Sequence, residues 1–321
     1  METAGIRRVL RFDTSTAPLL ALVALFLVSI AISPHFFHLG NLLNILRQVS
    51  YTGIIALGMT FVIISGGIDL SVGSMTALCG GFAVIAMNAA GGDTRAIILA
   101  FVVSLAAGAV FGILNGVLIT RFRLAPFIVT LGSMSIFRSL TLYFVSGGEY
   151  RSQSTIYQSV GSSYFLGVPV PAWIFILLAV LFYAVLNHTA YGRFVCAVGS
   201  SERVARYSSI NVRRVKFVTY LITGLTVGVT AVMLSSRLNS VSSGNAGAAF
   251  ELDAIAAVVI GGTSMSGGTG TIPGTVVGAL ILGVINNMLN MMGVSPYLQG
   301  MVKGLVIILA VLMQFRRNKE N

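Results

Sequence analysis

The sequence predicts an all-α integral membrane protein with about ten transmembrane helices, some of them broken or re-entrant. Of its 321 residues, 56% are hydrophobic and only 9% are charged, and the mean hydropathy is +0.92. A soluble domain carries about 25% charged residues, so we expect the apolar excess to face lipid. A helix needs about 20 apolar residues to cross a bilayer, and the chain length accommodates roughly ten such crossings with their connections.

Ten apolar runs supply the expected spans. In chain order they are 17–33, 48–65, 71–90, 96–120, 127–145, 170–187, 216–235, 253–263, 274–293 and 298–315. The first run follows a basic stretch, but we expect an uncleaved span because Pro34 directly follows the small residues near Ala31 and Ser33. The eighth is too short to cross about 30 Å of hydrocarbon, so we expect it to be broken, re-entrant or extended by its polar flanks.

The distribution of lysine and arginine predicts that both termini are cytoplasmic. With the N-terminus placed inside, the inner segments hold most of the 20 basic residues: Arg7, Arg8, Arg11, Arg121, Arg123, Arg193, Arg203, Arg206, Arg213, Arg214, Lys216, Arg316, Arg317 and Lys319. The outer segments hold Arg47, Arg95, Arg151 and Arg237. Cytoplasmic loops are enriched in these residues, which favours an even number of spans. Because the net charge of +11 is sorted by loop, we do not expect nucleic-acid binding.

We therefore expect one transmembrane domain over residues 1–321. It comprises a cytoplasmic N-terminal segment (1–16), a long cytoplasmic loop (188–215) and a cytoplasmic tail (316–321). Glycines spaced four residues apart, at 108 and 112 and at 274 and 278, predict close helix packing within this domain, because small residues let helices approach in lipid.

Two stretches interrupt the apolar runs with glycine and polar residues, at 65–73 and at 261–270. Backbone groups cannot stay unpaired against lipid, so such breaks must be buried in protein or line a watery cavity. Asp69 and Ser71 can cap the helix that follows the first break. Because unwound helices of transporters often lie at the substrate path, Asp69, Ser71 and Thr263 are also candidate pathway residues.

Polar side chains inside spans add further pathway candidates. Asn115 and Asn286 can donate and accept hydrogen bonds at once, as the hydroxyl groups of a solute require, although helix–helix hydrogen bonding is an alternative of at least equal weight. Arg138 lies deep in a span and is expected to face protein or water. Lys303 lies near the outer end of the last span, where its side chain can extend to the interface.

The loop at 188–215 is basic and contains a predicted amphipathic helix. Within it, Gly192, Arg193, Ala197, Gly199, Ala205, Ser208 and Ile210 match the coupling-segment pattern of the permease subunits of bacterial ABC-type monosaccharide importers, of the ribose-permease type. Ser201, Val204 and Ser209 stand where that pattern has Asn, Ala and Gly. The loop therefore resembles this family while departing from it at three positions.

Two further stretches carry the same resemblance. Gly-Gly-Ile-Asp-Leu-Ser-Val-Gly at 66–73 is similar to a signature near the second and third spans of the family, and 251–264 is similar to a later one. The similarity continues through 286–295 and covers about 34–312. Three matched stretches in the family's order are specific, whereas one alone would be weak.

The resemblance implies a non-catalytic permease of an ATP-driven importer in the bacterial inner membrane, carrying a monosaccharide such as ribose or a related pentose. It implies as partners a second permease copy in a homodimer, a cytoplasmic tandem ATPase that binds ATP and Mg, and a periplasmic sugar-binding protein. The chain has no Gly-x-x-x-x-Gly-Lys-Ser/Thr loop to hold ATP phosphates. We therefore expect no cofactor or metal in this chain.

The partners are assigned to two sets of residues. The ATPase contact is expected at Glu202, Arg203, Val204, Ala205, Tyr207, Ser208 and Ile210, with Val204, Tyr207 and Ile210 as the buried anchor. The outer segments 146–169 and 236–252 are expected to cap the protein, and there Arg151 and Arg237 are candidate contacts for carboxylates of the binding protein.

Two rival functions stay open from the residues alone. A secondary transporter driven by protons or sodium would use a buried carboxylate pair, for which only Asp69 and Asp253 are candidates. An integral-membrane enzyme would need a clustered catalytic set, and the sequence shows none.

Overall fold

The protein is represented by a computed structural model that describes residues 17–320, with no description of the side chains at 17, 31, 32, 34, 35, 296, 297, 310 and 313–320. Arg7, Arg8 and Arg11 lie outside the described residues, as do the side chains of Arg316, Arg317 and Lys319. The helices are α1 (Ala17–Ile32), η2 (Pro34–Phe37), α2 (Leu39–Ile64), α3 (Val72–Ala89), α4 (Thr94–Thr120), α5 (Pro126–Phe144), α6 (Thr155–Ser162), α7 (Val170–His188), α8 (Ala190–Ser200), α9 (Glu202–Tyr207), α10 (Val212–Leu238), α11 (Phe250–Ile260), α12 (Ile272–Met291) and α13 (Pro296–Glu320). The short strands are β1 (Glu149–Arg151), β2 (Tyr164–Phe165), β3 (Val168–Pro169) and β4 (Ser240–Ser242).

Every run expected to span the membrane contains a helix, and seven helices among the described residues are long and apolar enough to cross. These seven are α2, α3, α4, α5, α7, α10 and α12. Helix α2 begins at Leu39, nine residues before the expected start, so Arg47 lies inside the helix rather than in an outer loop. Polar side chains such as Asn41 lower the hydropathy there, but the amide of Asn41 exchanges hydrogen bonds with Asn287 on α12.

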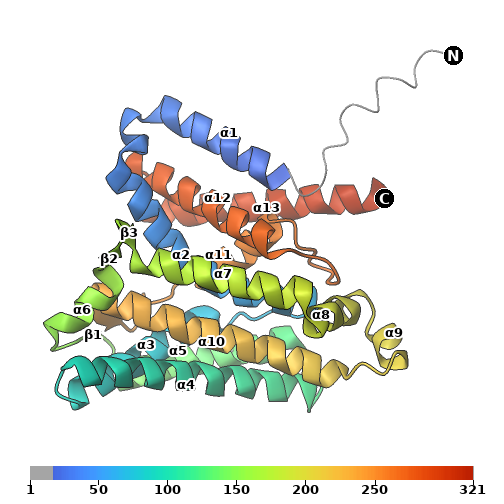
Figure 1. The fold of residues 1–321 in the computed structure, drawn as a ribbon, viewed down its shortest axis with the longest axis horizontal. Helices are drawn as coiled ribbons and strands as arrows, with labels where there is room; N and C mark the ends of the chain where they lie inside the picture. The colour runs from blue at the N-terminus through green and yellow to red at the C-terminus, as the bar shows by residue number, and fades with distance from the viewer. Residues whose placement is uncertain (1–16, 321) are drawn as a thin grey trace.

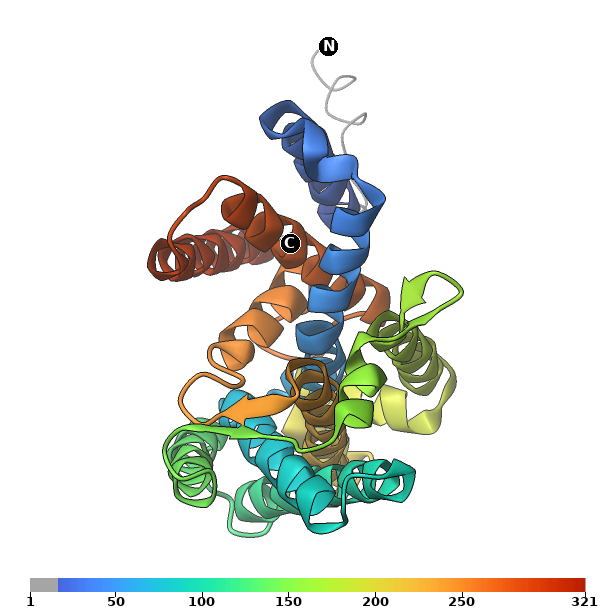
Figure 2. The ribbon, with the colours of Figure 1, turned by 90° about the vertical axis from the view of Figure 1, so that its left-hand side faces the viewer.

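The most buried helix is α2, and it runs through the centre of the bundle (Figure 1). In its most apolar stretch 83% of residues are buried, against 22% for α4 and α7. Exposed apolar residues on α4 and α7 therefore form outward faces suited to lipid. Helices α1, α12 and α13 form a second group packed on one side of α2 (Figures 1 and 2).

The predicted glycine packing is confirmed. A β-carbon at Gly108 of α4 would overlap the carbonyl oxygen of Gly224 on α10, and one at Gly224 would overlap that of Gly108. Gly278 of α12 meets the carbonyl oxygen of Ala257 on α11 in the same way. Both helix pairs thus approach closely enough that an added methyl group would clash with backbone.

The predicted breaks are also confirmed. Non-helical chain separates α2 from α3 and α11 from α12. Helix α11 has only 11 residues, which at about 1.5 Å each reaches roughly half-way across the hydrocarbon. Residues 253–259 of this helix are all buried, as an interrupted helix inside a bilayer requires.

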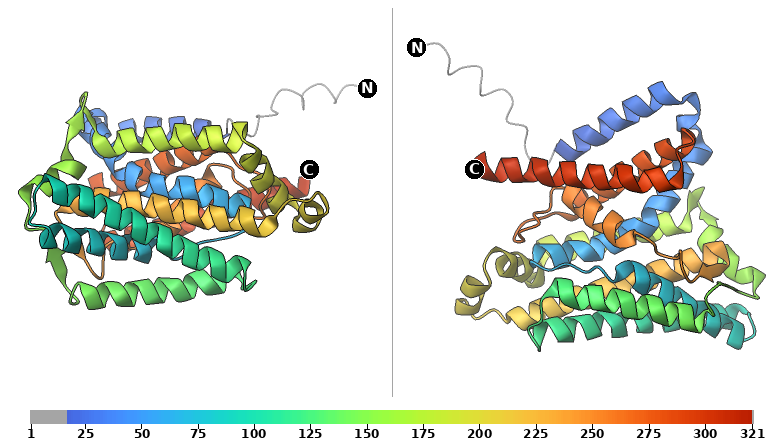
Figure 3. Two further views of the ribbon diagram at one scale, coloured as in Figure 1. Left: turned by 60° about the horizontal axis from the view of Figure 1, so that its bottom comes forward. Right: turned by 180° about the vertical axis from the view of Figure 1, so that it is seen from behind.

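The two ends of the bundle differ. Helices α8 and α9 project from one end, the end at which α1 begins and α13 finishes (Figures 1 and 3). At the opposite end the segments 146–169 and 236–252 are joined, because β1 pairs antiparallel with β4, Tyr150 facing Val241 (Figure 2).

Candidate functional site

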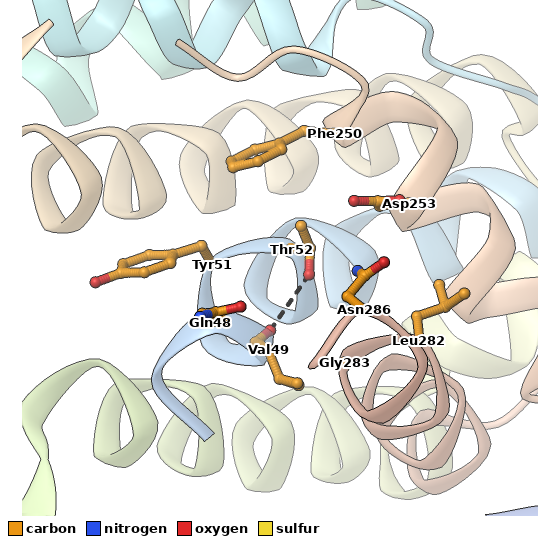
Figure 4. Close-up of a pocket in the computed structure, with 9 residues that line it drawn as sticks. All are labelled: Gln48, Val49, Tyr51, Thr52, Phe250, Asp253, Leu282, Gly283 and Asn286. Carbon is orange, nitrogen blue, oxygen red and sulfur yellow. Dashed lines mark hydrogen bonds between the residues drawn. The ribbon is translucent and has the colours of Figure 1, made fainter. Parts of the chain in front are cut away.

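A cavity of about 210 Å³, lined by both polar and apolar side chains, lies where α2, α11 and α12 meet. Figure 4 shows the side chains that line it, which are Gln48, Val49, Tyr51, Thr52, Phe250, Asp253, Leu282, Gly283 and Asn286. Helix α2 contributes four of these residues from adjacent turns, and α11 contributes two from its first turn. The cavity thus forms beside the start of the half-length helix, where the chain re-enters the bundle.

Asp253, one of the residues that line this cavity, forms an ion pair. The carboxylate of Asp253 accepts from Lys303 Nζ on α13 at 2.9 Å, and only 7% of Asp253 is exposed. Lys303 therefore does not extend to the membrane surface as we expected from the sequence, because a buried carboxylate lies within its reach. The pair joins the half-length helix to the last helix.

Of the asparagines inside spans, Asn286 is the one in this cavity with a free acceptor, since its buried Oδ1 has no hydrogen-bond partner. Asn287, next in the chain, bonds to Asn41 instead. Asn115 is also engaged: its Nδ2 donates to Ser71 Oγ at 2.9 Å and its Oδ1 accepts from Ser133 at 2.6 Å. Asn115 thus makes hydrogen bonds between helical segments, as the alternative for it expected.

The first break is held together by Asp69, which is fully buried. Its Oδ1 accepts from the backbone N–H of Ser71 at 2.9 Å and from the Ser71 hydroxyl at 2.6 Å, which fixes the turn into α3. Its Oδ2 has no hydrogen-bond partner. The Tyr220 hydroxyl on α10 donates to the carbonyl of Ile68. Asp69, Ser71 and Asn115 therefore form a connected polar network apart from the cavity lining.

Arg138 and Thr263 also lie away from the cavity lining. The guanidinium of Arg138 donates to the carbonyls of Ser243 and Ala246, at 2.9 and 3.0 Å, and so pins the chain that leads into α11. Thr263 is buried in the second break, where its side chain lies against Gly270. Among the six predicted pathway residues, only Asn286 lines the cavity.

The segment at 190–210 is built by successive side-chain caps. Thr189 caps α8, Ser201 caps α9 and Asn211 caps α10, each accepting a backbone N–H from the first turn. Ser209, two residues after the end of α9, has φ +61°, a left-handed conformation that Gly adopts without strain. Serine at this position, where the family pattern has glycine, therefore forms the same turn but in a backbone conformation that is strained for it.

Helix α9 exposes an apolar and basic surface. Val204 is 61% exposed and Tyr207 is 84% exposed, whereas Ala205 is buried against the protein. Glu202 pairs with Lys216 of α10 and with Arg206, which orients the helix. Ile210 is half-buried against the chain's own core, so only Val204 and Tyr207 of the predicted anchor are freely presented. Arg203, Arg206 and Ser208 are exposed beside them.

Helix α8 makes a close backbone contact that the sequence did not single out. A β-carbon at Gly199 would overlap the carbonyl oxygen of Ile64 at the end of α2 and crowd the N–H of Gly268 in the second break. The Gly268 N–H also donates to the Ile64 carbonyl at 2.9 Å. The projecting segment is thus packed directly onto the helix that lines the cavity and onto the connection between the other two helices.

At the opposite end, Arg151 is exposed and pairs with Glu149 at 3.1 Å. The Ser240 hydroxyl and Arg151 both bond to Glu149, which lowers the pKa of that carboxyl below its ordinary value. Arg237 is half-buried and lies over the ring of Tyr51, 5.8 Å from its centre. Arg151 is available to a partner, whereas Arg237 is turned toward the protein because an aromatic face lies beside it.

Most of the residues that line the cavity were not predicted from the sequence. Gln48, Tyr51 and Thr52 lie on neighbouring turns of α2, and their polarity within an apolar run is the signal that could have indicated them. Phe250 gave no such signal. Among the residues that the structure describes, no group of three His, Cys, Asp or Glu side chains could hold a metal ion.

Comparison with known proteins identifies related chains along nearly the whole length. Residues 41–311 match the family described as branched-chain amino acid transport system / permease component. The chain is 46% identical to the ribose import permease protein RbsC of Bacillus subtilis, covering 94% of this chain and 92% of that protein. It is 41% identical to RbsC of Escherichia coli (93% of each chain), and 32% identical to the galactofuranose transporter permease protein YtfT of Escherichia coli (98% and 94%). No solved structure matches the chain.

Proposed function

Because this chain belongs to the family of permease components of branched-chain amino acid transport systems, we propose that it is the membrane subunit of an ABC importer for a monosaccharide, ribose or a related pentose. It is a multi-pass protein of the bacterial inner membrane. The observation that carries the proposal is the similarity to ribose import permeases over more than nine-tenths of the chain. Relatives named for galactofuranose and arabinose transport support a sugar substrate more broadly.

The cavity is our candidate for the place where the sugar passes. Asn286 Oδ1 can accept from a hydroxyl, and Gln48 and Thr52 can donate or accept beside it. The rings of Tyr51 and Phe250 offer apolar faces to the carbon skeleton of a sugar. Asp69, Ser71, Asn115, Arg138 and Thr263 are proposed as supports that hold the broken segments in place.

The contact at Gly199 supplies a route from ATP to this cavity. A partner that moves α9 moves α8, and α8 is packed on the end of α2 and on the connection between α11 and α12. Those three helices form the cavity walls. A close-packed contact transmits displacement because interiors are nearly incompressible. Motion at α9 would therefore open or close the cavity without any catalytic residue in this chain.

The partners follow from the family. We propose a cytoplasmic ATPase, holding ATP and Mg, on Val204 and Tyr207 of α9, with Glu202, Arg203, Ala205, Arg206, Ser208 and Ile210 shaping or orienting that surface. A periplasmic sugar-binding protein would contact the β1–β4 end near Arg151, and a second copy of this chain would complete a homodimer. Ten spans with both termini cytoplasmic fit this arrangement, because α1 begins and α13 ends at the end that carries α9.

Copurification tests the ATPase contact. The variant Val204→Asp/Tyr207→Asp places charge where an apolar anchor is proposed and is expected to lose the ATPase during purification, since truncating a central anchor commonly costs about 2 kcal/mol or more. Gln153→Asp, an exposed change at the opposite end, is the control and should retain it. Retention of the ATPase by the double variant would place the contact elsewhere.

Uptake by proteoliposomes tests the transport activity. Vesicles containing this chain, its ATPase and its binding protein should accumulate labelled ribose only with internal ATP, and unlabelled ribose should compete better than galactose. Uptake driven by a proton or sodium gradient without ATP would favour the ion-coupled alternative.

A further inference from the structure

The β2–β3 hairpin at the β1–β4 end of the bundle has an unusual tip. Tyr164 pairs with Pro169 and Phe165 with Val168, and the two-residue turn is Leu166-Gly167. Both turn residues have positive φ, +51° and +78°, as a type I′ turn requires. Asn, Asp and Gly are favoured at such positions, so a leucine there is strained. Figure 2 shows the hairpin projecting from the periphery of the bundle.

The tip is apolar as well as strained. Tyr164, Phe165 and Leu166 are 54%, 60% and 79% exposed, and they are consecutive. Leu166 has a strained backbone conformation and an exposed side chain, so its position is unfavourable in water. The arrangement becomes favourable where an apolar medium accepts these three side chains.

The surroundings of the hairpin indicate lipid as that medium. No charged residue occurs from 152 to 187, so the hairpin and the start of α7 carry no charge of their own that would lose its hydration at the bilayer surface. The hairpin leads directly into α7, whose Leu177 and Val180 are exposed on the outward apolar face. Trp173, on the first turn of α7, donates its Nε1–H to the Phe165 carbonyl at 2.9 Å. The rings of Trp173 and Phe165 also pack edge to face.

Tryptophan and tyrosine concentrate at membrane–water interfaces, where a ring can be buried and its polar atom hydrated. We propose that the β2–β3 hairpin inserts its tip, Tyr164 to Leu166, into the interfacial region of the bilayer and anchors the start of α7 there. In the orientation proposed above this is the outer leaflet. The hairpin is then continuous with the lipid-facing surface of α7.

The anchor has a direct connection to the cavity. The guanidinium of Arg47 on α2 lies over the Tyr164 ring, 4.8 Å from its centre. Arg47 immediately precedes Gln48, the first residue of the cavity wall. Anchoring the hairpin in lipid therefore fixes the part of α2 that directly precedes its four cavity residues.

The single tryptophan of the chain makes the proposal testable. In a Trp173→Phe background, Leu166→Trp puts the only tryptophan at the tip, and Gln153→Trp puts it at an exposed control position at the same end of the bundle. Each protein is placed in nanodiscs with lipids brominated near the top of the acyl chain, and in separate samples iodide is added to the water. We expect bromolipid to quench the tip tryptophan and iodide to leave it bright, with the opposite pattern at position 153.

A second measurement needs no substitution. Hydroxyl-radical oxidation of the wild-type protein in nanodiscs should modify Tyr207, exposed at the other end of the bundle, and spare Tyr164. Quenching of the tip by iodide together with oxidation of Tyr164 would overturn the proposal. A tip that is shielded only after the sugar-binding protein is added would also overturn it and assign the hairpin to that partner.

Discussion

Replacing Gly199 by alanine should separate ATP hydrolysis from sugar movement. The added methyl group would overlap the Ile64 carbonyl oxygen, which is backbone and cannot rotate away. Overpacking of this kind costs about 1–3 kcal/mol. Displacing Gly268 also weakens its bond to Ile64, worth about 1 kcal/mol. Alanine returns about 0.5–1 kcal/mol of helix propensity, so we expect a net destabilisation of about 1–3 kcal/mol.

The same substitution at Gly132 of α5 is the matched control, because no atom lies within 4 Å of the position where its β-carbon would be. Thermal unfolding should show a lower midpoint for Gly199→Ala and no decrease for Gly132→Ala. Sugar uptake per ATP hydrolysed should fall only for Gly199→Ala, with the ATPase still copurifying because the surface of α9 is unchanged. Equal uptake per ATP in the two variants would refute the route through α8.

Three further predictions concern single side chains. Lys303→Met should destabilise the protein toward the lower end of about 3–5 kcal/mol, since it leaves the Asp253 carboxylate buried without its partner, beside a cavity that also holds the polar side chains of Gln48 and Asn286. The double variant Asp253→Asn/Lys303→Met should recover much of this stability. Chemical denaturation in micelles measures both variants, and a double variant as unstable as the single one would contradict the pairing. Asp69→Asn keeps the acceptor for Ser71 and should leave ATP-driven uptake independent of pH. If the wild type instead takes up solute with protons and the variant does not, the result would favour an ion-coupled transporter. Glu149 has a folded pKa below its ordinary value, so its bonds to Ser240 and Arg151 add stability above that ordinary value, and the stability is lost as pH falls through the lower folded pKa. The unfolding midpoints of wild type and Glu149→Gln should therefore differ at neutral pH and converge in acid, and a difference that persists in acid would contradict this role.

Much of the fold could be predicted from local sequence. Hydropathy located the helices because lipid demands long apolar runs, and glycine-rich polar interruptions located the breaks because unpaired backbone is excluded from lipid. The predicted start of α2 was wrong by nine residues, because Asn41 is polar and yet lies inside the helix, where it pairs with Asn287 on a distant helix. Hydropathy cannot distinguish such a paired amide from one at a helix end.

The candidate site was less predictable. The exposed α9 surface could be read locally, because caps and helix periodicity are properties of neighbouring residues. The cavity could not, because its residues on α2 (48–52) lie about two hundred residues or more along the chain from those on α11 and α12 (250–286). Asn286 and Asn287 are adjacent in sequence and alike in chemistry, but only packing directs one into the cavity and the other onto Asn41.

The sequence by itself therefore determined that this is a membrane protein with broken helices and a projecting basic segment, since composition, periodicity and backbone constraints act over short range. Its resemblance to ABC permeases, carried by three short motifs, indicated the function. Only the tertiary structure decided which polar groups face the cavity, that Lys303 binds Asp253, and that Gly199 joins α8 to α2 and to the second break. These are contacts between surfaces far apart in the chain, and their geometry depends on how whole helices pack rather than on any local pattern.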